Sequence, residues 1–193
     1  MTIILASNNI HKIEEIRTIL SGDLQHDVLS MRQSGFTASI EENGTSFEEN
    51  ALIKARAVYA FSLLPVIADD SGLCVDYLNG APGIHSARYM NLPDDESRYR
   101  HLVSQMDSVP DEKRTARFVC VIAYIDSAGS EHTFTGTCEG IISRIARGKH
   151  GFGYDPVFIP EGFSNTLAEI DPKTKNRISH RAKALEKLVS FLS

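Results

Sequence analysis

Cysteine is scarce in this chain, and the few cysteines form no recognisable pattern. Cys74, Cys120 and Cys138 are odd in number, widely spaced and set among apolar neighbours. Such a set argues against a disulfide framework and against a zinc site, and it favours reduced, buried thiols. We therefore expect a cytoplasmic protein.

Long apolar runs are also missing from the 193 residues. The apolar run at residues 2–6 is too short for the core of a signal peptide, and no basic segment comes before it. No stretch approaches the roughly 20 apolar residues that a membrane-spanning helix needs. We expect a soluble protein with no membrane partner.

An excess of positive charge is absent too. Lysine and arginine total 20 against 25 aspartates and glutamates, which gives a net charge of −5. A chain of this sign has no general attraction to a polyanion, so direct nucleic-acid binding is not expected. A small anion can still bind in a local basic pocket.

Helix-like and strand-like segments alternate along the whole chain without a linker, a repeat or a break in composition. Apolar spacing, a capping box at Ser46 and Glu49, and Pro172 at a helix start indicate the helices. Helices are predicted over residues 10–20, 46–62 and 94–106, after Asp171 and from His180 onwards. Strands are predicted over residues 2–6, 65–68, 116–125, 132–145 and 156–159, whereas the pattern at residues 27–29 is too weak to carry a prediction. This interleaving predicts an α/β fold, with a mixed central sheet flanked by helices, in a single domain of residues 1–193.

Three of the predicted strands end in polar or glycine-rich segments, around Asn8, Asp70 and Gly153. The strand at 65–68 is expected to stop at Asp69, and an extended pattern resumes only at residues 73–75. Two acids would then lie at a strand end. Ligands in α/β folds gather where strands end and loops converge, so these three segments are candidate site segments.

The first segment, Ser7-x-Asn9-x-x-Lys12, joins a predicted strand to the first turn of a helix. The unpaired N–H groups and the positive dipole end of a helix N-terminus favour an anion, and a lysine one turn in adds a point charge. This pattern predicts phosphate binding. The alternative is that Ser7 or Asn9 only caps the helix and that Lys12 is solvated.

Two acidic turns, Glu41-Glu42-Asn43-Gly44 and Asp69-Asp70-Ser71-Gly72, are each closed by glycine. Carboxylate oxygens suit Mg²⁺, which takes one or two of them and completes its shell with water and phosphate. The alternative is a pair of exposed acidic turns. That alternative is weaker for Asp69 and Asp70, because a strand end after an apolar run is a poor place for two carboxylates without a task.

The segment Gly151-Phe152-Gly153-Tyr154-Asp155-Pro156 combines two glycines with two aromatic side chains. The glycines permit close backbone approach, and the aromatic rings can stack on a base or can anchor the turn to the core. Lys175 and the cluster Ser179-His180-Arg181 supply donors for an anion or a purine edge. The alternative is a basic face on an amphipathic helix.

Taken together, these segments resemble the inosine/xanthosine triphosphate pyrophosphatase family, also called Ham1-like. The resemblance covers essentially the whole chain, and six segments in order are far more specific than any one of them. The matching segments are Ser7–Lys12, Glu41–Gly44 with Phe47, Asn50, Ala51, Lys54 and Ala55, Ala68–Leu73, Ala81–Tyr89, Phe152–Pro156 and Ile178–Arg181.

The resemblance implies a two-lobed fold with an active-site cleft between the lobes, a Mg²⁺ cofactor and a homodimer. It implies hydrolysis of ITP, dITP and XTP to the monophosphate and pyrophosphate, which removes these purine nucleotides from the pool before DNA or RNA synthesis. Glu41 and Asp70 would hold the metal, and Asp70 would also accept a proton. The substrate-binding residues would be Ser7, Asn8, Asn9, Ile10, His11, Lys12, Ser71, Phe152, Gly153, Tyr154, Asp155, Lys175, His180 and Arg181, with Lys54 as a further phosphate contact.

The first segment departs from the family pattern, because small residues are common where this chain has Asn8 and His11. Its phosphate contacts are therefore the least defined. One rival is the Maf-like group of house-cleaning pyrophosphatases, whose first segment typically ends in arginine where this chain has Lys12. A second rival is a nucleotide-binding regulatory module without catalysis, which would need no acidic metal site.

Overall fold

The computed structural model describes residues 2–20 and 27–193. The chain divides into two compact units, named unit 1 and unit 2 below. Unit 1 consists of Met1–Asp70, Cys120–Gly136 and Arg181–Ser193. Unit 2 consists of Ser71–Val119 and Thr137–His180.

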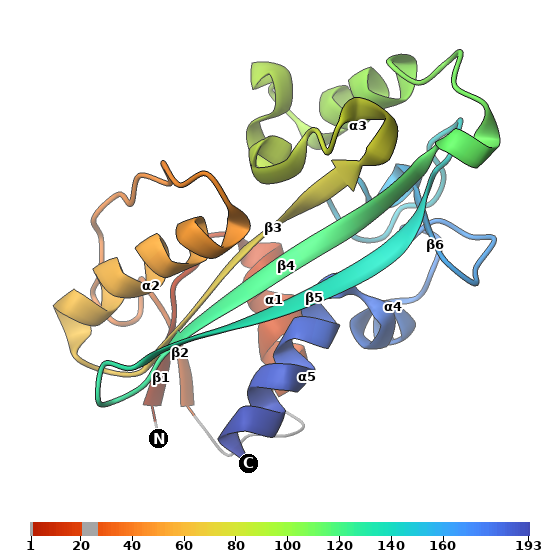
Figure 1. Cartoon of the computed structure of the whole chain (residues 1–193). Helices are drawn as coiled ribbons and strands as arrows, with labels where there is room; N and C mark the ends of the chain where they lie inside the picture. The colour runs from red at the N-terminus through yellow and green to blue at the C-terminus, as the bar shows by residue number, and fades with distance from the viewer. Residues whose placement is uncertain (1, 21–26) are drawn as a thin grey trace. The chain divides into compact units, whose positions relative to one another are not determined.

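Six strands form one hydrogen-bonded sheet in the order β2-β1-β3-β4-β5-β6 (Figure 1). Their bounds are Thr2–Leu5 (β1), Asp27–Ser30 (β2), Val66–Val75 (β3), Thr115–Ile125 (β4), Glu131–Ile142 (β5) and Phe158–Pro160 (β6). β1 pairs in parallel with both β2 and β3, whereas β5 and β6 are antiparallel. The predicted α/β fold with a mixed sheet is therefore confirmed.

Unit 1 packs helices on both faces of its part of the sheet, because successive residues of a strand point to opposite faces. Ile3, Leu5 and Ile67 share one core with α1 (Ile10–Leu20) and α5 (His180–Leu192). Ile4 and Ala68 share the other core with α2 (Phe47–Ser62). The two faces of β3 therefore pack against different helices. The same alternation places Asp69 and Asp70, the next two residues of the strand, on opposite faces.

Unit 2 has a third core, built on its own parts of β3, β4 and β5. Leu102 and Met106 pack there with Phe118, Tyr154 and Phe158. The helices of this unit are α3 (Asp95–Ser104) and α4 (Pro172–Ile178), and short 3-10 segments cover Asp76–Leu78, Gly83–Asn91, Asp111–Lys113 and Asp155–Val157.

The sequence predictions for the helix starts hold well. Ser46 caps α2 by accepting the backbone N–H of Glu49 at 3.1 Å, as predicted. In a full capping box Glu49 would accept the N–H of Ser46, but its Oε2 accepts the N–H of the preceding residue, Thr45, at 2.6 Å. Asp94 caps α3 and Asp171 caps α4 by the same chemistry.

The prediction for β3 is wrong, because this strand does not stop at Asp69 but runs unbroken from Val66 to Val75. Asp69 and Asp70 therefore lie inside a strand, where they contact cationic side chains from three helices, as described below. The apolar spacing that predicts the helix over residues 10–20 includes Ile10 as its first apolar position, but Ile10 is 68% exposed and does not join the buried face of α1. β5 ends at Ile142, before the predicted residue 145.

All three cysteines are free thiols. Cys120 and Cys138 are buried, as the sequence predicts, whereas Cys74 is half-buried. Within residues 2–20 and 27–193, no helix has the length and apolar character needed to cross a membrane.

Candidate active site

The segment from Ser7 to Lys12 leads from β1 into α1 in unit 1. Asn9 caps the helix, since its Oδ1 accepts the backbone N–H of Lys12 at 3.2 Å. Ser7 Oγ accepts the N–H of Asn9 at 3.2 Å and so fixes the turn before the helix. Asn8, Asn9, Ile10 and His11 are exposed. The segment therefore combines a capped helix N-terminus with an open surface that a phosphate can reach.

Lys12 is not solvated, which rules out that part of the alternative interpretation. Its Nζ lies 2.8 Å from Oδ2 of Asp69, a residue only 1% exposed. Arg181 Nη2 lies 3.5 Å from the same oxygen, and Arg181 Nη1 pairs with Glu15. Burial alone would raise the pKa of Asp69, but the charges of Lys12 and Arg181 outweigh it and hold that pKa well below its usual value.

Asp70 points to the other face of β3, toward α2. Its Oδ2 accepts a hydrogen bond from Asn50 Nδ2 at 3.3 Å, and Lys54 Nζ lies 3.6 Å from its Oδ1. Lys54 is closer to Glu42, with Nζ to Oε2 at 2.6 Å. Burial raises the pKa of Asp70, and the nearby carboxylates of Glu42 and Asp69 add to the rise, which Lys54 and Lys12 offset only in part.

The group around Asp70 carries more negative than positive charge and fits a hard divalent cation. The pKa of Asp70 is raised because burial, with the charges of Glu42 and Asp69, outweighs the opposing charges of Lys54 and Lys12. Among the residues that the structure describes, no three His, Cys, Asp or Glu side chains form a metal cluster. Mg²⁺ does not need one, because one or two carboxylates suffice when water and phosphate complete its shell. Glu41, the predicted second ligand, is exposed, whereas Glu42 pairs with Lys54.

The predicted nucleotide-binding turn, Phe152 to Asp155, lies in unit 2 and is tightly held. Asp155 Oδ2 accepts the backbone N–H of Phe152 at 2.9 Å and the ammonium of Lys175 at 2.7 Å. The same ammonium lies 4.9 Å from the centre of the Phe152 ring. A Cβ at Gly151 would lie 2.0 Å from Asp155 Oδ2, so the turn requires glycine there.

The two aromatic residues of this turn differ in role. Tyr154 is 3% exposed and donates its hydroxyl hydrogen to the backbone carbonyl of Ser86 at 3.0 Å, so it anchors the turn to the core. Phe152 is half-buried and retains exposed surface. Of the two rings, Phe152 is therefore the one that is able to stack on a base.

His180 and Arg181 are adjacent in sequence but belong to different units. In unit 2, the His180 ring stacks on Phe118, with ring centres 4.7 Å apart and an interplanar angle of 11°. In unit 1, Arg181 is buried between the carboxylates of Asp69 and Glu15. Ser71, the first residue of unit 2 on β3, is half-buried. The predicted base-reading donors thus have distinct surroundings, and those of Arg181 are mainly carboxylates.

Sequence reasoning missed several residues that contact the predicted ones. Glu15 could not be found, because nothing in the sequence links it to Arg181, which is 166 positions away. Asn50 lies within one of the six matching segments, but its bond to Asp70 has no sequence signal. Asp95 was missed as well, although its Oδ2 accepts the N–H of Gly153 at 2.7 Å.

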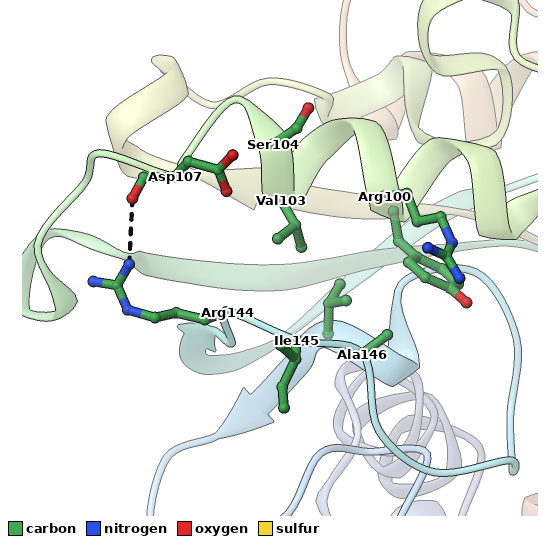
Figure 2. Close-up of a pocket in the computed structure, with 9 residues that line it drawn as sticks. Arg100, Val103, Ser104, Asp107, Arg144, Ile145 and Ala146 are labelled. Carbon is green, nitrogen blue, oxygen red and sulfur yellow. Dashed lines mark hydrogen bonds between the residues drawn. The ribbon is translucent and has the colours of Figure 1, made fainter.

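A separate hollow in unit 2 contains none of the predicted site residues (Figure 2). It has a volume of about 380 Å³ and lies between α3 and residues 144–146. Arg144 Nη1 donates to the backbone carbonyl of Asp107 across one end of it at 3.3 Å (Figure 2). Its two arginines already have acidic partners, Glu96 for Arg100 and Asp111 for Arg144.

Comparison with known proteins supports the resemblance over the full length of the chain. The model of the Ham1 family matches residues 3–191. A dITP/XTP pyrophosphatase of Desulforamulus reducens is 45% identical over 195 residues, covering 100% of this chain and 96% of the relative. A dITP/XTP pyrophosphatase of Bacillus subtilis is 44% identical over 190 residues, covering 98% and 96%. A solved structure of a HAM1 protein from Coxiella burnetii has a TM-score of 0.90 and 40% identity, covering 100% of this chain and 98% of that one. The chain therefore belongs to the Ham1 family.

Proposed function

We propose that this protein is a Mg²⁺-dependent nucleoside-triphosphate pyrophosphatase that converts ITP, dITP and XTP to the monophosphate and pyrophosphate. Relatives with more than 40% identity over nearly the whole chain carry the name dITP/XTP pyrophosphatase. The observation that carries the proposal is the buried Asp70 carboxylate, whose raised pKa and neighbouring Lys54 suit a proton acceptor beside a phosphate.

In the proposed reaction, water attacks the α-phosphorus and pyrophosphate leaves, which yields the monophosphate in one step. Asp70 orients the water and takes its proton. Lys12 and Lys54 place positive charge near the phosphates, where negative charge develops as the bond breaks. Mg²⁺, when held by Asp70 with Glu41, supplies further positive charge to the phosphate oxygens.

Selectivity for hypoxanthine and xanthine would come from hydrogen-bond donors that face the purine 6-position. These bases present a carbonyl acceptor there, whereas adenine presents an amino donor. A donor opposite a donor leaves buried groups unpaired, which costs about 1–3 kcal/mol per mismatch. We assign this role to His180 and Arg181. Arg181 also pairs with Asp69 and Glu15, so its role in base reading needs a direct test. If Arg181 reads the base, the ratio of kcat/KM for ITP to that for ATP should be lower in Arg181→Ala than in the wild type.

The direct test is product identification with the purified protein. ITP, XTP and ATP are incubated with Mg²⁺ and separately with a chelator, and pyrophosphate and orthophosphate are measured together. We expect Mg²⁺-dependent pyrophosphate from ITP and XTP, with far less from ATP. Orthophosphate with a nucleoside diphosphate would disprove attack at the α-phosphorus. Binding of ITP without any product would support the regulatory module instead.

The identity of the second metal-holding acid can be tested with a matched pair of variants. Glu41→Gln should raise the Mg²⁺ concentration needed for half-maximal activity, by about tenfold or more, because a carboxylate ligand is lost. Glu42→Gln should instead raise KM for the triphosphate, because Lys54 loses its nearest carboxylate and shifts position. If Glu42→Gln alone changes the Mg²⁺ requirement, Glu42 and not Glu41 holds the metal.

The proposal extends to the setting in which the enzyme works. We place it in the cytoplasm, as free thiols at Cys120 and Cys138 support, where it would clear purine nucleotides before DNA or RNA synthesis. We also propose a homodimer and no direct contact with nucleic acid, the latter consistent with the net charge of −5. Light scattering that gives a mass near 21.3 kDa at micromolar concentration would contradict the dimer.

A further inference from the structure

The turn at Phe152 to Asp155 is held by two carboxylates of different origin. Asp155 Oδ2 accepts the N–H of Phe152 from within the turn, at 2.9 Å. Asp95 Oδ2 accepts the next N–H, that of Gly153, at 2.7 Å from a helix 58 residues earlier in the chain. Both distances are typical of hydrogen bonds to an ionised acceptor. Two successive amides are therefore fixed by two different carboxylates.

Gly153 lies inside a turn that the backbone N–H of Asp155 closes by donating to the carbonyl of Phe152 at 3.2 Å. Its φ is +63°, in the left-handed region, and a Cβ built there would meet nothing within 4 Å. The glycine is therefore required by backbone conformation and not by crowding, and no packing on that side fixes the peptide. The bond from Asp95 adds a restraint on the Gly153 amide itself, next to the ring of Phe152.

Asp95 is itself held firmly. Its second oxygen, Oδ1, pairs with Arg98 Nη2 at 2.5 Å, and Arg98 Nη1 donates to the backbone carbonyl of Leu92 at 2.9 Å. Asp95 does not serve as the helix cap, because Asp94 accepts the N–H of Ser97 in that role. The start of α3 thus has one acid, Asp94, that caps the helix and a second, Asp95, that makes an outside contact. α3 also lies against the 3-10 turn that begins at Asp155.

We infer that Asp95 is a positioning residue for nucleotide binding. It fixes the Gly153 peptide, so that the exposed surface of the half-buried Phe152 ring is in place to stack on the purine. This inference rests on the proposed function. Asp95 acts on the substrate through the turn, so its loss should weaken binding more than chemistry. A turn that is free to move must be ordered again each time a nucleotide binds, and that cost appears in KM.

The experiment compares Asp95→Ala and Asp95→Asn with Glu96→Gln. Glu96 is the next residue of the same helix turn and pairs with Arg100 on the surface, so it controls for the loss of a charge there. We expect Asp95→Ala to raise KM for ITP by about threefold to tenfold with little change in kcat. Asp95→Asn keeps an acceptor oxygen and should restore most of the loss. Glu96→Gln should match the wild type.

Hydrogen exchange at the Gly153 amide gives a readout that does not depend on activity. Exchange should accelerate in Asp95→Ala and return toward the wild-type rate in Asp95→Asn. Unchanged Gly153 exchange in folded Asp95→Ala would overturn the inference, whether or not ITP is hydrolysed. A faster exchange with an unchanged KM would also overturn it. If the wild type releases no pyrophosphate from ITP, the proposed function fails, and the exchange result still decides whether Asp95 holds the turn.

Discussion

Asp69 and Asp70 are neighbours on β3, yet the two faces of this strand treat them in opposite ways. Asp69 faces α1 and α5 and lies beside Lys12 and Arg181, so its pKa is lowered despite complete burial. Asp70 faces α2, where Lys54 is shared with Glu42, and its pKa is raised. A satisfied buried carboxylate holds structure together, whereas an unsatisfied one is available for a proton or a cation. The comparison therefore supports the proposed assignment of a structural role to Asp69 and a chemical role to Asp70.

The largest expected effect comes from Asp70→Asn. The amide keeps the size of the side chain but cannot take a proton, so turnover of ITP should fall by about 10² to 10⁴. Stability should not fall with it, because the variant no longer buries a carboxylate whose charge Lys54 and Lys12 offset only in part. Pyrophosphate release and urea denaturation of the same preparation measure both quantities. Near-normal activity in this folded variant would exclude Asp70 as the proton acceptor.

Asp69→Asn should produce the opposite result, a loss of stability. Lys12 and Arg181 would lose the carboxylate that they share, and breaking a buried ion pair from one side costs about 3–5 kcal/mol. Urea denaturation of the metal-free protein gives the free energy of unfolding, with Asp70→Asn as the matched control. Equal stability of the two variants would remove the distinction between the faces of β3.

A smaller effect is expected in the pH dependence of stability. The pKa of Asp69 is lower in the folded state, so its stabilisation is present above the unfolded value near 3.8 and is lost as pH falls through the folded value. The pKa of Asp70 is higher in the folded state, so a penalty develops as pH rises from 3.8 through the folded value. Unfolding curves of the metal-free protein between acidic and neutral pH test both signs. Asp69→Asn should flatten the acid loss, whereas Asp70→Asn should remove the penalty.

Much of the fold follows from local sequence signals. The cap at Ser46, the helix start at Asp171 and the apolar run of β4 are each determined by residues within a few positions, and each prediction is confirmed. The continuity of β3 could not be predicted in this way. Asp69-Asp70-Ser71-Gly72 has the composition of a turn. The strand continues through it because cationic side chains from helices distant in sequence pair with the two carboxylates.

The candidate site shows the same division. The segment after β1 and the turn at Gly151 are predictable, because helix caps and glycine-dependent turns are local features. The partners of these segments are not local: Glu15 meets Arg181, and Asp95 meets Gly153, across long stretches of sequence. The metal and base-reading assignments remain predictions that the variants above can test.

The distribution of buried thiols gives each unit its own reporter of unfolding. The chain contains no tryptophan, so intrinsic fluorescence is weak, but Cys120 lies in unit 1 and Cys138 in unit 2, both buried. Burial raises the pKa of Cys120 to about 12, with a further contribution from Asp69, so the native thiol is inert toward alkylating reagents. Alkylation followed by peptide mass analysis would therefore record the opening of each unit separately, with the half-buried Cys74 as an internal standard for reagent access. A chain without tryptophan can in this way report whether its two units unfold together or one after the other.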